Sequence, residues 1–350
     1  MSKKVKILVM RYRFIGDTVL TVPFLRNLRY AYPDAQIDLM VAPVSGEIIE
    51  KCPYVDNFIY FDTTRKHRYE NKEGQDKKTF GYYVRLLRAE KYDKVYVLKR
   101  SLSSALLAFF AGIRERIGFN TEGRGFLLTK RTPYVIDRHE IDCFLDVLKT
   151  DDIDIRDSYL ENWVDDTELA CVKHTMLDNG VDFSKKIVIV HATSGNRKKE
   201  WAKDRWAKVI TWLSNEKDAQ VVFNGTKNDA TTYVEIMKYV DTELKNKPIN
   251  FCGQFNLRET LAFSKLCNLI VGCDSGNLHV AASVGIPVIG IYGPMNTTKW
   301  CARCDDAVIL KTDLPCQPCG LKKKCKRNYQ CISDISVELV ENSLEKYLTC

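Results

Sequence analysis

The segment from Ile270 to Pro294 constrains the fold of this chain more than any other part of the sequence. An apolar run ends at Asp274, a polar turn of Ser275-Gly276-Asn277 opens a small-residue helix, and a second apolar run begins at Pro287. This order predicts a strand, a helix and a parallel strand. A strand that enters a helix through Ser-Gly leaves free backbone N–H groups at the carboxyl end of a sheet, where α/β proteins bind phosphates.

Two side chains flank that predicted turn. Asp274 precedes it and His279 follows it within the helix. The backbone amides of Ser275 and Gly276, with a carboxylate and an imidazole beside them, form a candidate site for an anion. An ordinary strand–helix–strand unit with a capped helix is the alternative.

The length and the repeated pattern predict two α/β domains. The chain has 350 residues, which is more than one typical core accommodates. Apolar runs alternate with helical spacing in both halves, with one long helix expected over residues 16–30. We predict a first domain at 1–160, a second at 161–335 with a cysteine-rich loop at 301–331, and a terminal helix at 336–350.

The sequence has features of a cytoplasmic protein. Its longest apolar runs are far shorter than the roughly 20 residues of a membrane span. The N-terminus leads into a predicted strand without a signal-peptide cleavage region. We therefore expect a cytoplasmic location and mostly reduced thiols among the 13 cysteines.

Positive charge is concentrated in the first part of the sequence. Residues 1–150 contain 27 lysines and arginines against 18 aspartates and glutamates, whereas the remaining 200 contain 26 against 27. This asymmetry points to an acidic partner for the first domain, with a phosphorylated glycolipid, an anionic membrane surface and nucleic acid as candidates. A solvated basic face without a partner is the alternative.

Asp17 lies where the first predicted strand turns into the first predicted helix, directly after Gly16. A functional group is common at such a place in an α/β sheet, and a carboxylate there is a candidate general base. Its alternative role is a helix cap, which stabilises by about 0.5–2 kcal/mol. A helix N-terminus favours the charged form of a carboxylate and so opposes proton uptake, and the residues alone therefore favour the cap.

A polar loop follows the first predicted strand of the second domain. Between His191 and Trp201 it carries hydroxyls, a glycine and three successive cations. We predict a phosphate clamp, with a charged solvent loop as the alternative. The loop lacks the GxxxxGK[ST] spacing, and HExxH, GxSxG and GxGxxG after a strand are absent from the sequence. P-loop, metalloprotease, hydrolase and dinucleotide-dehydrogenase functions are therefore disfavoured.

Taken in order, these pieces resemble the ADP-heptose:lipopolysaccharide heptosyltransferases, glycosyltransferase family 9. The resemblance runs from Arg11 to about residue 335. Seven short motifs carry it, in this order: Gly16-Asp17-Thr18 with Pro23, Tyr92-Asp93, Arg116-Ile117-Gly118-Phe119, His139-Glu140-Ile141-Asp142, His191-Ala192-Thr193 with Lys199 and Trp201, Asp274-Ser275-Gly276-Asn277-Leu278-His279, and Gly293-Pro294. It implies a GT-B fold, with two Rossmann-like domains facing each other across a cleft. The nucleotide-sugar would bind the second domain and the acceptor the first, with no catalytic metal or other cofactor.

The resemblance also implies residue roles. Asp17 matches the family's proposed catalytic base, and Lys199 would assist catalysis by stabilising the departing diphosphate. The implied donor-binding residues are Thr193, Ser194, Lys199, Asp274, Ser275, Gly276 and His279. The family often has an acidic residue after the strand that here ends at Asn224-Gly225, and Lys227 lies in this region. Only Asp229, shifted by two places, could substitute for it.

The basic first domain fits an acceptor that bears phosphates or acidic sugars, such as a glycolipid at the cytoplasmic face of the inner membrane, and we do not expect a nucleic-acid partner. Candidate acceptor-binding residues are Arg65, Lys66, Arg68, Arg124 and Lys130.

Four cysteines lie within sixteen residues, at Cys316, Cys319, Cys325 and Cys331. In a reducing compartment this spacing predicts a structural metal site first, with zinc held by four thiolates. Iron is a second possibility, because a group of protein heptosyltransferases related to this family carries an iron-binding cysteine finger. Unligated cysteines in a packed loop are the alternative.

The leading functional hypothesis is an inverting glycosyltransferase that moves a heptose or a related sugar from a nucleoside-diphosphate sugar, expected to be ADP-heptose, to a lipopolysaccharide core. A protein O-heptosyltransferase that acts on a surface protein is the alternative among enzymes. A non-catalytic module that binds nucleotides or acidic polymers is the alternative from another class.

Overall fold

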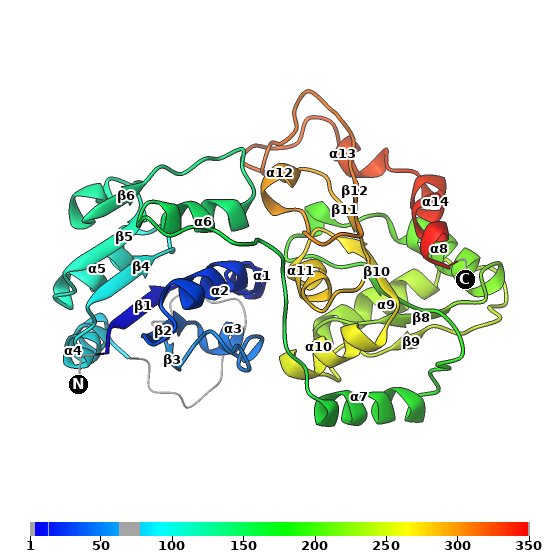
Figure 1. Ribbon diagram of the computed structural model, residues 1–350. Coiled ribbons are helices and arrows are strands. Elements are labelled where there is room, and N and C mark those ends of the chain that lie inside the picture. The colour runs from blue at the N-terminus through cyan, green and yellow to red at the C-terminus, as the bar shows by residue number, and fades with distance from the viewer. Residues whose placement is uncertain (1–3, 13, 63–77, 349–350) are drawn as a thin grey trace. The chain divides into compact units, whose positions relative to one another are not determined.

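The computed structural model describes residues 4–12, 14–62 and 78–348 of the chain (Figure 1). Their contacts divide the chain into two compact units, Met1–Tyr159 and Leu160–Cys350. Each unit contains one six-stranded sheet in which every pair of neighbouring strands is parallel. Parallel sheets need helical connections between their strands, which matches the alternating pattern of the sequence.

The first unit has the strand order β3-β2-β1-β4-β5-β6. Its strands are β1 (Lys6–Met10), β2 (Gln36–Val41), β3 (Asn57–Tyr60), β4 (Lys94–Val97), β5 (Glu115–Phe119) and β6 (Lys130–Thr132). Its helices are α1 (Ile15–Val19), α2 (Val22–Ala31), α3 (Pro43–Glu47), α4 (Phe80–Glu90), α5 (Leu102–Phe110), the 3-10 helix η1 (Arg124–Leu127) and α6 (Glu140–Lys149).

Both faces of the first sheet are buried. On one face Leu8 and Met10 of β1 pack with side chains of α4 and α5, among them Leu87 and Leu107. On the other face Phe24 of α2 packs edge-to-face against Tyr96 of β4, and α2 lies against α6. Burial on both faces explains why these strands are continuous apolar runs rather than alternating ones.

The helix expected over residues 16–30 is interrupted. The structure has two helices, α1 and α2, joined at Leu20 and Thr21. Pro23 lies in the first turn of α2, where its missing N–H costs nothing, but in a continuous helix it would lose a backbone hydrogen bond. The prediction of one helix was therefore wrong at this position.

The second unit has the order β12-β11-β10-β7-β8-β9. Its strands are β7 (Ile187–His191), β8 (Gln220–Phe223), β9 (Ile249–Asn250), β10 (Leu269–Cys273), β11 (Val288–Ile291) and β12 (Ala307–Leu310). Its helices are α7 (Asp166–Asp178), η2 (Arg197–Lys199), α8 (Lys203–Asn215), η3 (Lys227–Asp229), α9 (Ala230–Met237), α10 (Leu257–Leu266), α11 (Gly276–Ser283), α12 (Thr297–Trp300), α13 (Gln330–Ser333) and α14 (Val337–Leu348).

Helices cover both faces of the second sheet as well. One core joins the sheet to α8, α9 and α14, and Trp206 is its largest buried side chain. The other core joins the sheet to α7, α10 and α11. Val340 and Leu344 of α14 belong to the first of these cores, so the C-terminal helix is an integral part of this unit.

The longest helices in the described ranges, α7 and α8, have 13 residues each. Among the helices of those ranges, none combines the length and the apolar character that crossing a bilayer would require.

The connection between the units is fixed on its N-terminal side by Arg26 of α2. This side chain is completely buried, and its guanidinium donates to the carboxylate of Asp157 and to the carbonyl of Tyr159, the latter at 2.8 Å. The same guanidinium stacks on the Tyr159 ring at 3.6 Å. The last residues of the first unit are therefore held on α2.

A second arginine fixes the connection on its C-terminal side. Arg258 of α10 donates to the Glu168 carboxylate at 2.9 and 2.8 Å and to the carbonyl of Trp163 at 2.6 Å. Leu160, the first residue of the second unit, packs against the core formed with α7 and α10.

Candidate active site

Both sheets share one topology, and it places the predicted site residues. The first sheet has the strand order 3-2-1-4-5-6, and the second sheet has the same order when its strands β7 to β12 are numbered 1 to 6 and read from β9. This is the order of Rossmann-like folds. In such sheets ligands bind outside the carboxyl ends of the two central strands, where the order reverses. Asp17 follows β1 at this point in the first sheet, whereas Ser194 and Asp274 follow β7 and β10 in the second.

In the second unit, Asp274 is the centre of a polar cluster. The Lys199 ammonium donates to the backbone carbonyl and to the carboxylate of Asp274, both at 3.0 Å. The Ser194 hydroxyl donates to the same carbonyl at 2.8 Å. The Asp274 and Lys199 side chains are only 10% and 17% exposed, so this ion pair is shielded from solvent. The structure thus brings together three of the predicted donor-binding residues from two loops.

The loop after β7 is shaped by hydrogen bonds of its own. Asn196 caps η2 by accepting from the Lys198 amide, which sets the position of Lys199. The Ser194 amide donates to the Glu200 carboxylate at 3.1 Å. Burial is the main cause that raises the pKa of Glu200. Sequence reasoning missed Glu200, although its position next to three cations was a visible signal.

The predicted phosphate-binding turn lies at the start of α11. Ser275 is the N-cap in an extended conformation, its side chain makes no capping bond, and Gly276 begins the helix with an exposed backbone. Within the described residues the buried Ser275 hydroxyl has no hydrogen-bond partner. Ligand oxygens could therefore take the place of a side-chain cap here. His279 is buried on the same helix, one turn further.

A small hollow of about 10 Å³ lies at the carboxyl ends of β7 and β8. Thr193, Asn224 and Asp229 are among its lining residues. Asp229 accepts from the amide and the hydroxyl of Thr226 at 2.6 and 2.7 Å, so its carboxylate closes a turn beside the hollow. Asp229, the substitute acidic residue that the sequence offered, therefore lies beside the carboxyl end of β8, and its role in binding the donor stays a prediction.

His191, the last residue of β7, is a buried part of the same edge. Its Nδ1 lies 3.0 Å from the Asn224 carbonyl and 3.1 Å from the Asn277 amide. Burial lowers the pKa of His191, so the neutral imidazole is the form present in the native protein at neutral pH.

A larger cavity, of about 300 Å³, lies at the carboxyl ends of β11 and β12. Its lining is mostly polar and includes Asn296, Thr297, Thr298, Lys311, Asp313 and Gln317. Gln317 holds this region together by donating to the Gly293 carbonyl and accepting from the Leu314 amide, both at 2.8 Å. Sequence reasoning did not identify these residues. The Gly293-Pro294 turn after an apolar strand was the only signal.

In the first unit, Asp17 is held by an arginine from the preceding strand end. Its carboxylate lies 2.7 Å from the Arg11 guanidinium, and both side chains are largely buried. The N-cap of α1 is Phe14, and Asp17 is the third residue of that helix. Asp17 is therefore not the capping residue itself, but it is the acidic residue of the first helical turn, where its charge favours the helix N-terminus. A helix-stabilising role stays the alternative to the catalytic base.

The structure does not support two of the five predicted acceptor-binding residues. Arg65, Lys66 and Arg68 lie outside the described residues. Arg124 is completely buried, and its guanidinium donates to the carbonyls of Phe119, Lys99 and Ser101. Burial lowers the pKa of Arg124 to about 10. Because this guanidinium is engaged with loop carbonyls inside the fold, the prediction that Arg124 contacts an acceptor was wrong.

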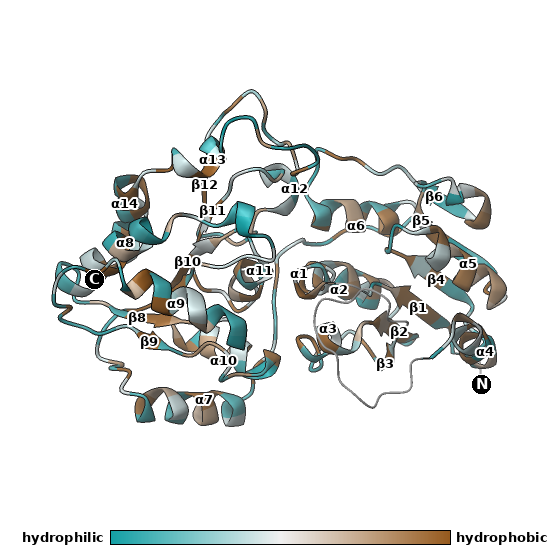
Figure 2. Ribbon diagram, turned by 180° about the vertical axis from the view of Figure 1, so that it is seen from behind, coloured by the Kyte–Doolittle hydropathy of each residue, from teal (hydrophilic) through white to brown (hydrophobic). Residues whose placement is uncertain are grey.

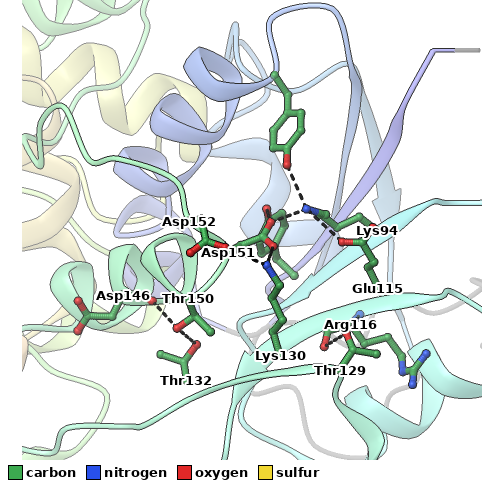
Figure 3. Close-up of polar contacts among 12 residues, drawn as sticks. Lys94, Glu115, Arg116, Thr129, Lys130, Thr132, Asp146, Thr150, Asp151 and Asp152 are labelled. Atoms are coloured by element: carbon green, nitrogen blue, oxygen red, sulfur yellow. Dashed lines mark hydrogen bonds and ion pairs between the residues drawn. The ribbon is translucent and has the colours of Figure 1, made fainter. Parts of the chain in front are cut away.

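Lys130 is likewise engaged elsewhere (Figure 3). It begins β6, and its ammonium lies 2.8 Å from the Asp151 carboxylate and 3.3 Å from that of Asp152. Asp151 also binds Lys94, the first residue of β4, so the cluster lies at the amino ends of the strands. Asp17, by contrast, follows the carboxyl end of β1. Lys130 therefore lies at the opposite ends of the strands from Asp17, which does not suit the predicted role in acceptor binding.

The four clustered cysteines lie within electrostatic range of one another. Burial and the neighbouring thiols of Cys319, Cys325 and Cys316 raise the pKa of Cys331 to about 11. In the described parts of the chain, however, no set of three or more His, Cys, Asp or Glu side chains is arranged to hold a metal ion. Zinc or iron at these four cysteines stays a prediction from their spacing, to be tested by metal analysis of the purified protein.

Comparison with known proteins supports the assignment of these residues to one family. Residues 82–330 match the family model described as glycosyltransferase family 9 (heptosyltransferase). The chain is 27% identical to lipooligosaccharide heptosyltransferase 2 of Haemophilus influenzae, over 98% of this chain and 99% of that protein. It is also 27% identical to lipopolysaccharide heptosyltransferase 2 of Escherichia coli, over 83% of each chain.

Solved structures show the same fold. A glycosyltransferase family 9 structure from Veillonella parvula superposes with a TM-score of 0.83 at 25% identity, covering 99% of this chain and 98% of that one. The structure of E. coli ADP-heptose LPS heptosyltransferase II superposes with a TM-score of 0.78 at 23% identity, covering 98% of both chains. The two parallel sheets are thus the two Rossmann-like domains of a GT-B fold, and the chain is a glycosyltransferase that belongs to glycosyltransferase family 9, the heptosyltransferases.

Proposed function

We propose that this glycosyltransferase moves a heptose from ADP-heptose to a lipopolysaccharide core, with inversion at the anomeric carbon and without a catalytic metal. The observation that carries the proposal is the convergence of Lys199, Ser194 and Asp274 at the switch point of the second sheet. Its similar relatives are named as heptosyltransferases of lipopolysaccharide and lipooligosaccharide.

The second unit has suitable groups for the donor. As the bond between the anomeric carbon and the diphosphate breaks, negative charge grows on the leaving phosphate oxygens. The Lys199 ammonium and the N–H groups at Ser275 and Gly276 can stabilise that charge. The Asp274 carboxylate can accept hydrogen bonds from sugar hydroxyls. Lys199 is positioned by Asp274 before the donor arrives, which reduces the cost of ordering it.

The first unit supplies the proposed base. An acceptor hydroxyl attacks the anomeric carbon from the face opposite the diphosphate, and its proton passes to the carboxylate of Asp17. Arg11 holds that carboxylate through one oxygen at 2.7 Å. We expect a phosphorylated or acidic glycolipid as acceptor, because the first 150 residues carry an excess of nine positive charges. Such an acceptor places the enzyme at the cytoplasmic face of the inner membrane.

The test is transfer of radiolabelled heptose from ADP-heptose by the purified protein, with chelator present. We expect label in lipid extracted from a strain whose core lacks heptose, and none with UDP-glucose as donor. Lys199→Ala should abolish most transfer. Lys203→Ala is the matched control, because Lys203 follows the same loop and pairs with Glu235 instead.

Other results would contradict the proposal. Label in protein rather than lipid would favour the protein O-heptosyltransferase. No transfer, together with a rise in melting temperature on adding ADP, would favour a non-catalytic nucleotide-binding module.

A further inference from the structure

Helix α5 is apolar on both of its faces. Its inner side chains, Ala105, Leu107 and Ala108, are buried in the core with α4. Yet Leu102 is 41% exposed, and Phe109 and Phe110 are each 47% exposed. Positions 102, 109 and 110 share one side of a helix, with the partly buried Leu106 between them. Figure 2 shows much of α5 in the brown of hydrophobic residues, and the helix packs on the inner strands β4 and β5.

The neighbouring 3-10 helix extends this apolar surface. η1 contacts α5, and Phe126 of η1 is 73% exposed, the most exposed of the large apolar side chains in the described residues. A half-exposed aromatic side chain presents on the order of 100 Å². Together the four side chains present roughly 400 Å², within the range of the largest apolar patch of a soluble protein, which often has a function.

Two guanidinium groups contact the two phenylalanines, and a third arginine follows the helix in sequence. Arg88 of α4 donates to the Phe110 carbonyl at 2.5 Å, and the Arg116 guanidinium lies 5.5 Å from the centre of the Phe109 ring. Arg114 is exposed just after the helix ends. The nearest acidic residue in sequence, Glu115, lies 3.3 Å from Lys94. We call Leu102, Phe109, Phe110, Phe126, Arg88, Arg114 and Arg116 the α5 patch.

We propose that the α5 patch docks this enzyme on an anionic lipid bilayer, with the aromatic rings among the upper acyl chains and the arginines at the lipid phosphates. Apolar side chains ringed by cations are the combination that binds the interface of anionic membranes. The charge of the first 150 residues, an excess of nine positive charges, complements such a surface.

A second copy of the chain is a poorer occupant. A two-fold interface would set the patch against itself and bring guanidinium groups of one sign together. The roughly 400 Å² of apolar surface is also about half of the ~800 Å² per partner that stable interfaces bury. The inference names a docking surface for the membrane location in the proposed function, and it can be tested with neither donor nor acceptor present.

The experiment is flotation of the full chain with vesicles of phosphatidylcholine alone or mixed with phosphatidylglycerol. We expect binding to the anionic vesicles, weaker binding in high salt, and little binding to neutral vesicles. Phe109→Ser with Phe110→Ser should reduce binding at least about tenfold, because two apolar side chains no longer leave water. Arg114→Glu should reduce binding to anionic vesicles. Val234→Ser, at an equally exposed position on α9, should change nothing.

Two further measurements keep the outcome clear. Melting curves should match between the wild type and the double serine variant, and transfer to a detergent-dispersed acceptor should be retained, which separates docking from catalysis. Absence of wild-type vesicle binding, or equal binding by the double variant, would overturn the proposal. A dimer in light scattering that the double variant abolishes, without vesicle binding, would identify the patch as a self-association surface and would equally overturn it.

Discussion

Replacing Lys199 by methionine should destabilise the second unit even without a ligand. The substitution keeps the apolar stem but removes two hydrogen bonds of 3.0 Å, one to the Asp274 carboxylate and one to its carbonyl. A hydrogen bond that involves a charged group contributes about 1.5–3 kcal/mol. The carbonyl keeps its bond from Ser194, so the loss comes mainly from a carboxylate left without its cation at 10% exposure. We expect the free energy of unfolding to fall by about 2–3 kcal/mol.

A double-mutant cycle isolates the pair. Asp274→Asn removes the charge that Lys199 neutralises, so the double variant should lose less than the sum of the two single losses. The expected coupling energy is about 1–2 kcal/mol. Lys203→Met is the matched control, because its partner Glu235 is 41% exposed and such surface pairs contribute about 0–1 kcal/mol.

Tryptophan fluorescence during denaturant unfolding is the appropriate measurement. All five tryptophans of the chain follow Leu160 and so belong to the second unit, and Trp201 lies two residues after Lys199. The signal therefore follows the unit that carries the substitution. A coupling energy below about 0.3 kcal/mol would refute the reasoning, because independent sites add within that margin.

Three further predictions concern single side chains. Asp17→Asn should lower kcat by about 10²–10⁴ while donor affinity changes little, and near-normal turnover in a folded variant would leave Asp17 only its structural pairing with Arg11. The pKa of Glu200 is raised in the native state, so its stabilising contribution is present below its unfolded pKa of 4.5 and is lost as pH rises through the native pKa. Glu200→Gln should therefore have a melting temperature at pH 7 equal to or above that of the wild type. A clear decrease would contradict this. The pKa of His191 is lowered in the native state, so its contribution to stability is present above its unfolded pKa of 6.5 and is lost as pH falls through the native pKa. His191→Asn should therefore reduce the loss of stability between pH 7 and pH 5. An unchanged loss would show that His191 does not cause it.

Residues at the switch points could be predicted from the sequence because the signal is local. Asp274 and Ser194 come directly after buried parallel strands, and such strands are continuous apolar runs that end abruptly. The fold class followed from the same alternation. The ion pair of Lys199 with Asp274 joins residues 75 positions apart, and the sequence did not predict it; the resemblance to a known family only assigned both residues to the donor site.

The wrong predictions share a physical cause, which is that a charged side chain in a sequence does not reveal its partners. Arg124 looks like a surface cation, but the carbonyls of Phe119, at the end of β5, and of Lys99 and Ser101, after β4, accept hydrogen bonds from its guanidinium. Lys130 looks equally free, but Asp151 at the end of α6 approaches it in space. The sequence did not predict the short strand β6, which depends on its tertiary pairing with β5. It also did not predict the break before α2, which depends on the missing backbone N–H of Pro23.

The two arginine clamps on the connecting segment restrict its torsional freedom. Arg26 holds the carbonyl of Tyr159, Leu160 packs on the second unit, and Arg258 holds the carbonyl of Trp163. While both contacts are intact, the two ends of this short segment, at Tyr159 and Trp163, are each held by a buried guanidinium. Glycine at Leu160 would widen the dihedral range and remove the packing, whereas proline would fix φ near −65°. The conformation of this connecting segment can therefore be changed by a substitution at Leu160, which belongs to neither candidate site.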